Sequence, residues 1–127
     1  MNIISEWMVE ASSHTCGAWP PSTDEFAKSG LTPLASDLIK PDRVEESAYH
    51  MECKLYSKNE IFNDSGVHTS TVVLGRVVRF HISEPILEDG AHGVLTTNTL
   101  ELKPCGRLGG DRWAALGHTF DIKRPAV

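Results

Sequence analysis

The sequence of 127 residues lacks both a cluster of lysine and arginine and a long apolar run. Its 12 basic residues are outnumbered by 17 acidic ones, which gives a formal net charge of −5 at pH 7. Nucleic acids and anionic membranes attract basic proteins, so neither is expected as a partner. The apolar stretches, of which residues 72–74 are typical, are far too short to cross a bilayer.

Cysteine is also scarce, and Cys16, Cys53 and Cys105 form no closely spaced pair. Disulfide frameworks of secreted proteins usually contain an even and denser set. The first residues show neither the basic segment nor the long apolar core of a signal peptide. We therefore expect a cytoplasmic protein with reduced thiols. His14 lies close to Cys16, but two candidate ligands do not make a zinc site, and no metal is expected.

The composition is that of a globular protein, with 40% hydrophobic and 23% charged residues, and the length suits a single domain over residues 1–127. Apolar residues recur at steps of three and four from Ile3 to Ala11. This spacing predicts a short amphipathic helix, for which Ser5 is a suitable N-cap.

A second helix is expected after the rigid residues 19–21. Ser22 and Glu25 have the spacing of a capping box. Gly30 is suited to follow the last helical turn, so the helix is predicted to extend to Lys28. The next residues, up to Pro41, show no clear period and are expected to form a surface connection.

Two segments with alternating polarity predict strands, residues 49–56 and residues 69–82, with a turn at residues 63–66 between them. Strict alternation in the second strand places Val72, Leu74, Val78, Phe80 and Ile82 on one face and Val73, Gly75, Val77, Arg79 and His81 on the other. Glycine in the middle of a strand predicts a tight bend or a close approach by another group.

The C-terminal part holds short pieces. Residues 95–102 are compatible with either a strand or a short helix. Residues 107–113 predict a glycine-bearing loop that leads into a helical turn, and residues 120–122 predict a final strand. So few strands bury little apolar surface within one chain, so we expect either an incomplete barrel with helices outside it or a second copy that completes the barrel, and we favour oligomerisation.

Six segments carry a likeness to one known family. They are, in chain order, residues 2–6 (NIISE), 19–26 (WPPSTDEF), 30–33 (GLTP), 52–55 (ECKL), 72–78 (VVLGRVV) and 107–114 (RLGGDRWA). In this order the sequence resembles the flavin reductase-like family, the FMN-binding split barrels of the flavoredoxin type. The likeness extends over essentially the whole chain, and it corresponds to the C-terminal part of a family member.

The resemblance implies a mainly β (α+β) fold, an incomplete split β-barrel with short peripheral helices. It also implies a homodimer with FMN at the subunit interface and flavin reduction that depends on NAD(P)H. The family's N-terminal strands, which supply much of the FMN contact, have no counterpart before Asn2. The family's common tyrosine in the glycine loop is Trp113 here, which keeps a flat aromatic face and loses the hydroxyl.

Flavin needs an apolar slot for its ring and donors for its carbonyls and phosphate. The candidate cofactor-binding residues are Asn2, Ser5, Arg107, Gly109, Gly110 and Trp113. The alternative is a glycine turn that merely closes the barrel, with Arg107 in a surface ion pair. Asn2 and Ser5 match the cofactor-side strand end of the family, but Ser5 is also a natural helix cap, and the cap is the favoured interpretation.

The candidate catalytic residues are His81 and Glu52, as proton donor or general acid and base. The alternative for His81 is a half-exposed structural residue, and for Glu52 a solvated side chain on a strand. The first functional hypothesis is a flavin-dependent oxidoreductase that acts on flavin or a small organic substrate. The others are a cofactor-free lyase, isomerase or cyclase that uses an apolar interface pocket, and a non-catalytic binding subunit.

Overall fold

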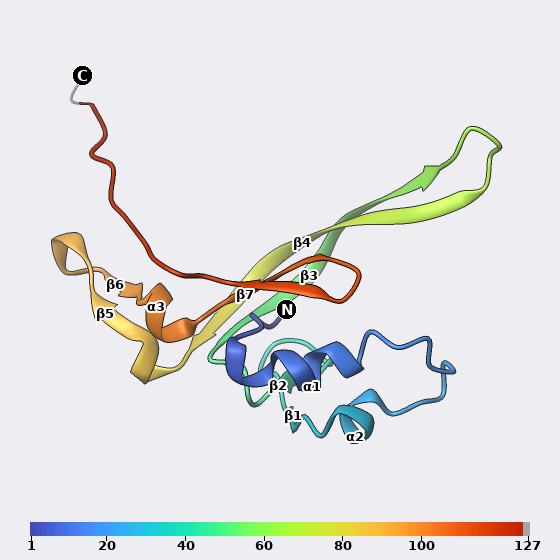
Figure 1. Ribbon diagram of the computed structural model, residues 1–127, viewed down its shortest axis with the longest axis horizontal. Coiled ribbons are helices and arrows are strands. Elements are labelled where there is room, and N and C mark those ends of the chain that lie inside the picture. Colours follow the sequence, from blue (N-terminus) through green and yellow to red (C-terminus); the bar gives the residue numbers. More distant parts are fainter. Residues whose placement is uncertain (126–127) are drawn as a thin grey trace.

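The computed structural model describes residues 1–125, which form mostly strands and a few short helices (Figure 1). The elements are η1 (Glu6–Met8), α1 (Val9–His14), α2 (Glu25–Ser29), β1 (Pro33–Leu34), β2 (Arg43–Val44), β3 (Tyr49–Phe62), β4 (His68–Ile82), η2 (Glu84–Ile86), β5 (Leu87–Asp89), η3 (Ala91–Gly93), β6 (Leu95–Thr97), α3 (Thr99–Leu102), β7 (Cys105–Gly109) and β8 (Arg112–Ala115). The strands pair as the antiparallel ribbons β1–β2, β3–β4, β5–β6 and β7–β8. They form no closed barrel within the described residues.

The β3–β4 hairpin is the longest feature, and its outer half projects away from the rest of the chain as an arm (Figure 1). Alternation predicted both strands, although β3 continues beyond the predicted residue 56 to Phe62. The predicted turn is present: Asn63 Oδ1 accepts hydrogen bonds from the backbone N–H groups of Ser65 and Val67 at 3.0 and 2.9 Å. The asparagine side chain thus fixes the loop that joins the two strands.

A bulge breaks the strict alternation that was predicted for β4. Glu52 pairs with Arg79, whereas the next residue of β3, Cys53, pairs with Val77, so Val78 has no opposite partner. Because neighbouring residues of β3 point to opposite faces, Arg79 and Val77 do so too. The prediction that they share a face is therefore wrong. The alternation of polar and apolar residues in one strand does not show which of its residues is left unpaired by the partner strand.

The first residues form an extended segment between β3 and β7. The N–H of Ile3 donates to Tyr49 O at 3.0 Å, and the N–H of Cys105 donates to Ile4 O at 2.9 Å. The helical segment begins where it was predicted, with Ser5 at the N-cap position and η1 starting at Glu6, although the Ser5 side chain makes no capping bond. Backbone pairing on both sides keeps Ile3 and Ile4 extended before this cap, although both fit the helical spacing.

The second helix, α2, begins at Glu25, and Asp24 rather than Ser22 caps it: its side chain accepts a hydrogen bond from the Ala27 N–H at 3.2 Å. Gly30 ends the helix with φ of 73°, as predicted. The connection that follows contains β1, whose Pro33 and Leu34 pair with β2.

The C-terminal part differs most from prediction. Residues 95–102 divide into the short strand β6 and the helix α3, so both alternatives hold in part. The glycine loop leads into β8 and not into a helical turn, and residues 120–122 form no strand. Hairpin pairing with β7 makes the segment after the glycines extended.

The buried apolar core is small: among the described residues it consists of Met8, Leu31, Ile86 and Leu102. By contrast, apolar side chains on the β3–β4 arm are exposed, and Leu55 and Val73 leave 67% and 59% of their surface open. The chain therefore presents apolar area that it does not cover itself. None of its described helices has the length and apolar character that a membrane crossing requires.

Candidate functional site

Glu52 lies at the base of the β3–β4 hairpin, and its side chain is completely buried. The expectation that a glutamate here would be solvated is wrong. Its Oε1 accepts a hydrogen bond from the Asp37 N–H at 2.8 Å, and Oε2 accepts one from the Leu38 N–H at 2.7 Å. His81 Nε2 lies 2.7 Å from Oε1. The carboxylate therefore joins the segment after β1 to β4.

The register of the hairpin brings this cluster together. Glu52 stands opposite Arg79, and His50 stands opposite His81, so all four side chains share one face. Arg79 Nη1 contacts Asp37 Oδ2 at 2.5 Å, which forms a second ion pair over the same segment. This polar face of the hairpin contacts the segment at Asp37 and Leu38. Alternating polarity alone would have placed these polar side chains in solvent.

The protonation state of Glu52 follows from these contacts. Burial alone raises the pKa of a carboxyl group, but the hydrogen bonds from the Asp37 N–H, from His81 and from the Leu38 N–H outweigh it. Together they lower the pKa of Glu52 from 4.5 to about 2. Glu52 is consequently an anion at neutral pH and accepts hydrogen bonds only.

His81 is oriented by this anion. Because an ionised carboxylate cannot donate, His81 Nε2 carries the proton in their hydrogen bond, and Nδ1 is the ring nitrogen left for another partner. The His81 side chain keeps 20% of its surface exposed, so it remains within reach of solvent. The pair has the arrangement of a base or acid held by a buried carboxylate.

The neighbouring His50 is held in a similar way by Asn2. Asn2 Oδ1 accepts a hydrogen bond from the Val44 N–H at 3.2 Å, which identifies it as the amide oxygen, and it lies 3.0 Å from His50 Nδ1. Burial, together with the positive charges of Arg43 and His81, lowers the pKa of His50 below 6.5. Asn2 thus connects β2 and β3 in the present structure.

Asp37, Glu52 and His81 are the described residues whose acid and imidazole ligand atoms come close enough to hold a metal, within 4.8 Å of one another. A cation at this position would meet the Arg79 guanidinium already on Asp37. Arg79 therefore already neutralises the charge of Asp37, and His81 already occupies Glu52.

The second feature is the β7–β8 hairpin. Gly109 ends β7 and Gly110 begins the turn, with φ of 102° and 56°, values that strongly favour glycine. The Arg107 guanidinium donates to Gly110 O from Nε at 3.1 Å and from Nη2 at 2.9 Å. It also lies over the Trp113 ring, 5.8 Å from the centroid. Arg107 closes the turn through these bonds and forms no ion pair within residues 1–125.

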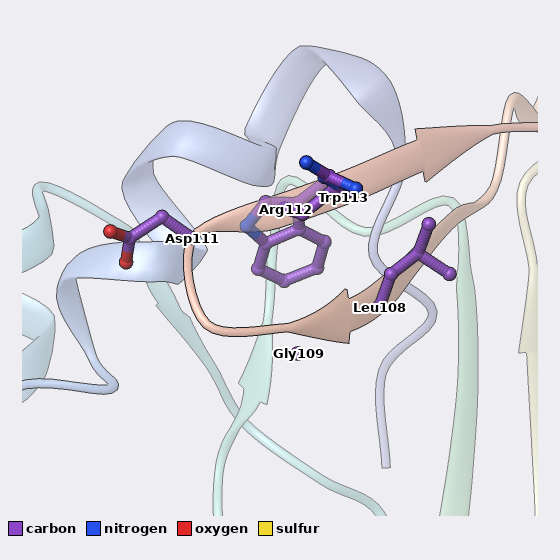
Figure 2. A pocket seen from close by; sticks show the side chains of 5 residues that line it. All are labelled: Leu108, Gly109, Asp111, Arg112 and Trp113. Atoms are coloured by element: carbon purple, nitrogen blue, oxygen red, sulfur yellow. The ribbon is translucent and has the colours of Figure 1, made fainter.

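A cavity of about 660 Å³ opens beside this hairpin, lined by Leu108, Gly109, Asp111, Arg112 and Trp113 (Figure 2). In Figure 2 the indole ring of Trp113 lies between Leu108 and Asp111, and the Asp111 carboxylate points away from the ring. The hollow therefore offers a flat aromatic face, a guanidinium and an open glycine backbone.

The model of the flavin reductase-like domain matches residues 1–98. The chain belongs to this family. Family members are flavin-related oxidoreductases, and the split-barrel assignment made from the sequence is confirmed as a fold class, since the chain is mostly strands with a few short helices.

Individual relatives agree with this assignment. The uncharacterized protein YwrF of Bacillus subtilis is 32% identical over 99% of the chain and 60% of its own length. The crystal structure of nitrilotriacetate monooxygenase component B from Bacillus cereus superposes with a TM-score of 0.84 at 32% identity, over 95% of this chain and 57% of that one. Flavoredoxin of Desulfovibrio vulgaris shares the fold, with a TM-score of 0.72 at 21% identity over 95% of this chain and 60% of that one. The chain thus spans about 60% of the length of these proteins.

The β7–β8 cavity of this flavin reductase-like chain fits part of a flavin. The indole of Trp113 can face an aromatic ring, and Arg112, which forms no ion pair in the described part of the chain, can face a phosphate. Asn2 and Ser5 do not line this cavity. The Asn2 oxygen is used by His50 and Val44, and Ser5 is fully buried with an Oγ that has no partner.

Sequence reasoning missed His50, Arg43 and the N–H groups of Asp37 and Leu38. A signal for part of this was present: His50 and Glu52 on one strand, and Arg79 and His81 on the next, are each two residues apart. Complementary charges with strand spacing on two strands joined by a turn indicate a paired polar face. Nothing in the pattern pointed to the loop donors at residues 37 and 38.

Proposed function

We propose that this chain contributes flavin contacts to an FMN-dependent oxidoreductase that reduces flavin or a small organic substrate. The observation that carries the proposal is the β7–β8 cavity, with its half-buried indole and free guanidinium, in a chain of the flavin reductase-like family. A cavity of about 660 Å³ lies within the range that binds cofactor-sized molecules.

Different residues of the β7–β8 hairpin bind different parts of FMN. Trp113 stacks on the ring system, and Arg112 neutralises the phosphate. Arg107 is a positioning residue, since its guanidinium holds the turn through Gly110 O and lies over the indole. When bound, FMN supplies the transfer of two electrons, with NAD(P)H as the proposed donor.

We assign His81 as the residue that moves the accompanying proton, through Nδ1. Glu52 is its positioning residue: it fixes the ring by the bond to Nε2 and stabilises the protonated imidazole electrostatically. Glu52 remains ionised throughout, because its pKa of about 2 lies far below neutral pH.

We further propose that a second copy of the chain covers the exposed apolar faces of the β3–β4 arm. Leu55, Val73 and Leu74 are all at least half exposed there. Exposed apolar side chains of this kind are usually covered by another protein surface. In a symmetric homodimer the same surface of each copy is covered by the other copy.

The test of the flavin proposal is a titration with FMN, followed by tryptophan fluorescence and by thermal unfolding. We expect saturable quenching and a rise in melting temperature, because a ligand that binds only the folded state stabilises it. Trp113→Ala should weaken FMN binding by roughly two- to tenfold, the value of one aromatic stacking contact.

Trp19→Ala is the matched control, since Trp19 is also partly exposed but lies outside the hairpin. It should leave FMN affinity unchanged. A protein that FMN neither quenches nor stabilises would overturn the proposal and favour cofactor-free chemistry or a binding subunit. Equal losses in the two variants would show that the hairpin is not the flavin contact.

A further inference from the structure

A second and smaller cavity lies between the β1–β2 ribbon and the base of the β3–β4 hairpin. Its volume is about 200 Å³, which is below the usual range for drug-sized ligands and suits a molecule of a few heavy atoms. Leu34 and Ile82 form its apolar wall. Its polar lining consists of two serines and four titratable residues, Arg43, Glu45, His50 and His81. It shares no lining residue with the β7–β8 cavity.

Arg43 is the informative residue of this cavity. Its Nη2 donates to Ala35 O at 2.9 Å, which holds the guanidinium in place. Its Nε is buried and has no hydrogen-bond partner. A buried donor on a charged group is costly to leave unpaired. Arg43 also forms no ion pair within residues 1–125, although Glu45 lines the same cavity.

Positively charged groups surround His50 at this cavity. Arg43 and His81 both lower the pKa of the buried His50, as does the amino group of Met1. Glu45 is exposed, so solvent screens much of its negative charge. Glu52, the nearest buried carboxylate on this side of the hairpin, is already engaged by His81.

We propose that this cavity binds a small carboxylate, with the Arg43 guanidinium as its principal donor. A planar carboxylate matches one edge of a guanidinium, and the apolar wall accepts a short carbon chain. The inference extends the proposed function, because His81 is the residue proposed to transfer a proton and the carboxylate would hold a substrate beside it. Carboxylate binding requires neither FMN nor turnover. An experiment can therefore contradict the carboxylate site without contradicting the FMN proposal, and the reverse also holds.

Binding and protonation are linked here. A bound carboxylate offsets the positive charges of Arg43, His81 and the Met1 amine that oppose protonation of His50. The pKa of His50 should therefore rise when the site is filled.

The experiment is an NMR titration with sodium acetate, with sodium chloride at matched ionic strength as the control. The Arg43 Nε–H resonance should shift saturably with acetate, and the pKa of His50 should be higher in acetate than in chloride. Arg43→Gln should weaken acetate binding by about tenfold or more, the value of a charge-assisted hydrogen bond. Glu45→Gln, at an exposed position, should strengthen it.

Arg112→Gln, which removes a guanidinium from the other cavity, should leave acetate affinity unchanged. Equal effects of acetate and chloride would overturn the proposal, and so would undiminished acetate binding by folded Arg43→Gln. If that variant does not fold, the sign of the Glu45→Gln effect decides, since an unchanged or weaker affinity contradicts a carboxylate in this cavity.

Discussion

Glu52 Oε1 and His81 Nε2 are 2.7 Å apart across the β3–β4 hairpin, one fully buried and the other one-fifth exposed. A buried anion thereby holds a solvent-accessible imidazole in one orientation. The same carboxylate fixes the N–H groups of Asp37 and Leu38, so the candidate proton-transfer residue and the loop beneath it depend on one charge.

Protein stability should fall as the pH is lowered from neutrality. The pKa of Glu52 is about 2 in the folded state against 4.5 ordinarily, so its contribution is complete above pH 4.5 and disappears between pH 4.5 and 2. The pKa of His50 is also lowered, from 6.5, so the unfolded chain takes up its proton first and stability already begins to fall below pH 6.5. Urea unfolding at a series of pH values measures this profile.

Glu52→Gln should reduce the dependence of stability on pH between pH 2 and 4.5, because unfolding then takes up about one proton fewer in this range. The variant should also be less stable at pH 7, since an amide has one acceptor oxygen and its NH₂ group would face a backbone N–H. Glu60→Gln, on the exposed part of β3, is the control and should keep the profile. A profile unchanged in Glu52→Gln would contradict the assignment.

Gly75→Val should destabilise the hairpin by about 1–3 kcal/mol, as other overpacked sites do. A Cβ at Gly75 would lie 3.2 Å from the Cys53 Cβ on the partner strand. Gly106→Val is the matched control, because no atom lies within 4 Å of its added Cβ. Chemical denaturation compares the two; equal stabilities would show that the close approach is not limiting.

Asn98→Ala should cost about 1 kcal/mol of stability, the usual value of a helix N-cap. Asn98 Oδ1 accepts hydrogen bonds from the N–H groups of Leu100 and Glu101 at 3.1 Å, which starts the helix that buries Leu102. Asn59→Ala on the exposed arm should change stability by less than about 0.5 kcal/mol. Thermal unfolding of both variants measures the difference.

Val72→Lys should weaken self-association by about tenfold, because the substitution places a charge on the apolar arm that a second copy is proposed to cover. Ser70→Lys, on the same strand but at a polar position, is the control and should associate like the unmodified protein. Sedimentation velocity at increasing concentration measures association. A monomer at every concentration would contradict the homodimer proposal.

The fold was predictable where local pattern and pairing agree. Alternating polarity located both strands of the hairpin, the Asn63 turn was marked by its own residues, and Gly30 marked the end of α2. The resemblance carried by six short segments supplied the family, which the domain match confirms.

Two of the failures depend on a partner that is distant in the sequence. The residues around Ile3 look helical, yet they lie extended between β3 and β7 because both strands offer backbone partners. The segment after Gly110, by contrast, pairs with the neighbouring strand β7 across a short turn. The Val78 bulge exists only with respect to β3.

By itself the sequence determined the strand periods, the turns and the presence of His81, Glu52 and Trp113 as chemically capable residues. Only the tertiary structure decided that Glu52 is buried and anionic. A buried carboxylate is stable only when hydrogen-bond donors surround it in a fixed geometry. Here the donors are the N–H of Asp37, fifteen residues earlier in the chain, and His81 on β4, beyond the hairpin turn. Their convergence on one carboxylate depends on the folded chain as a whole.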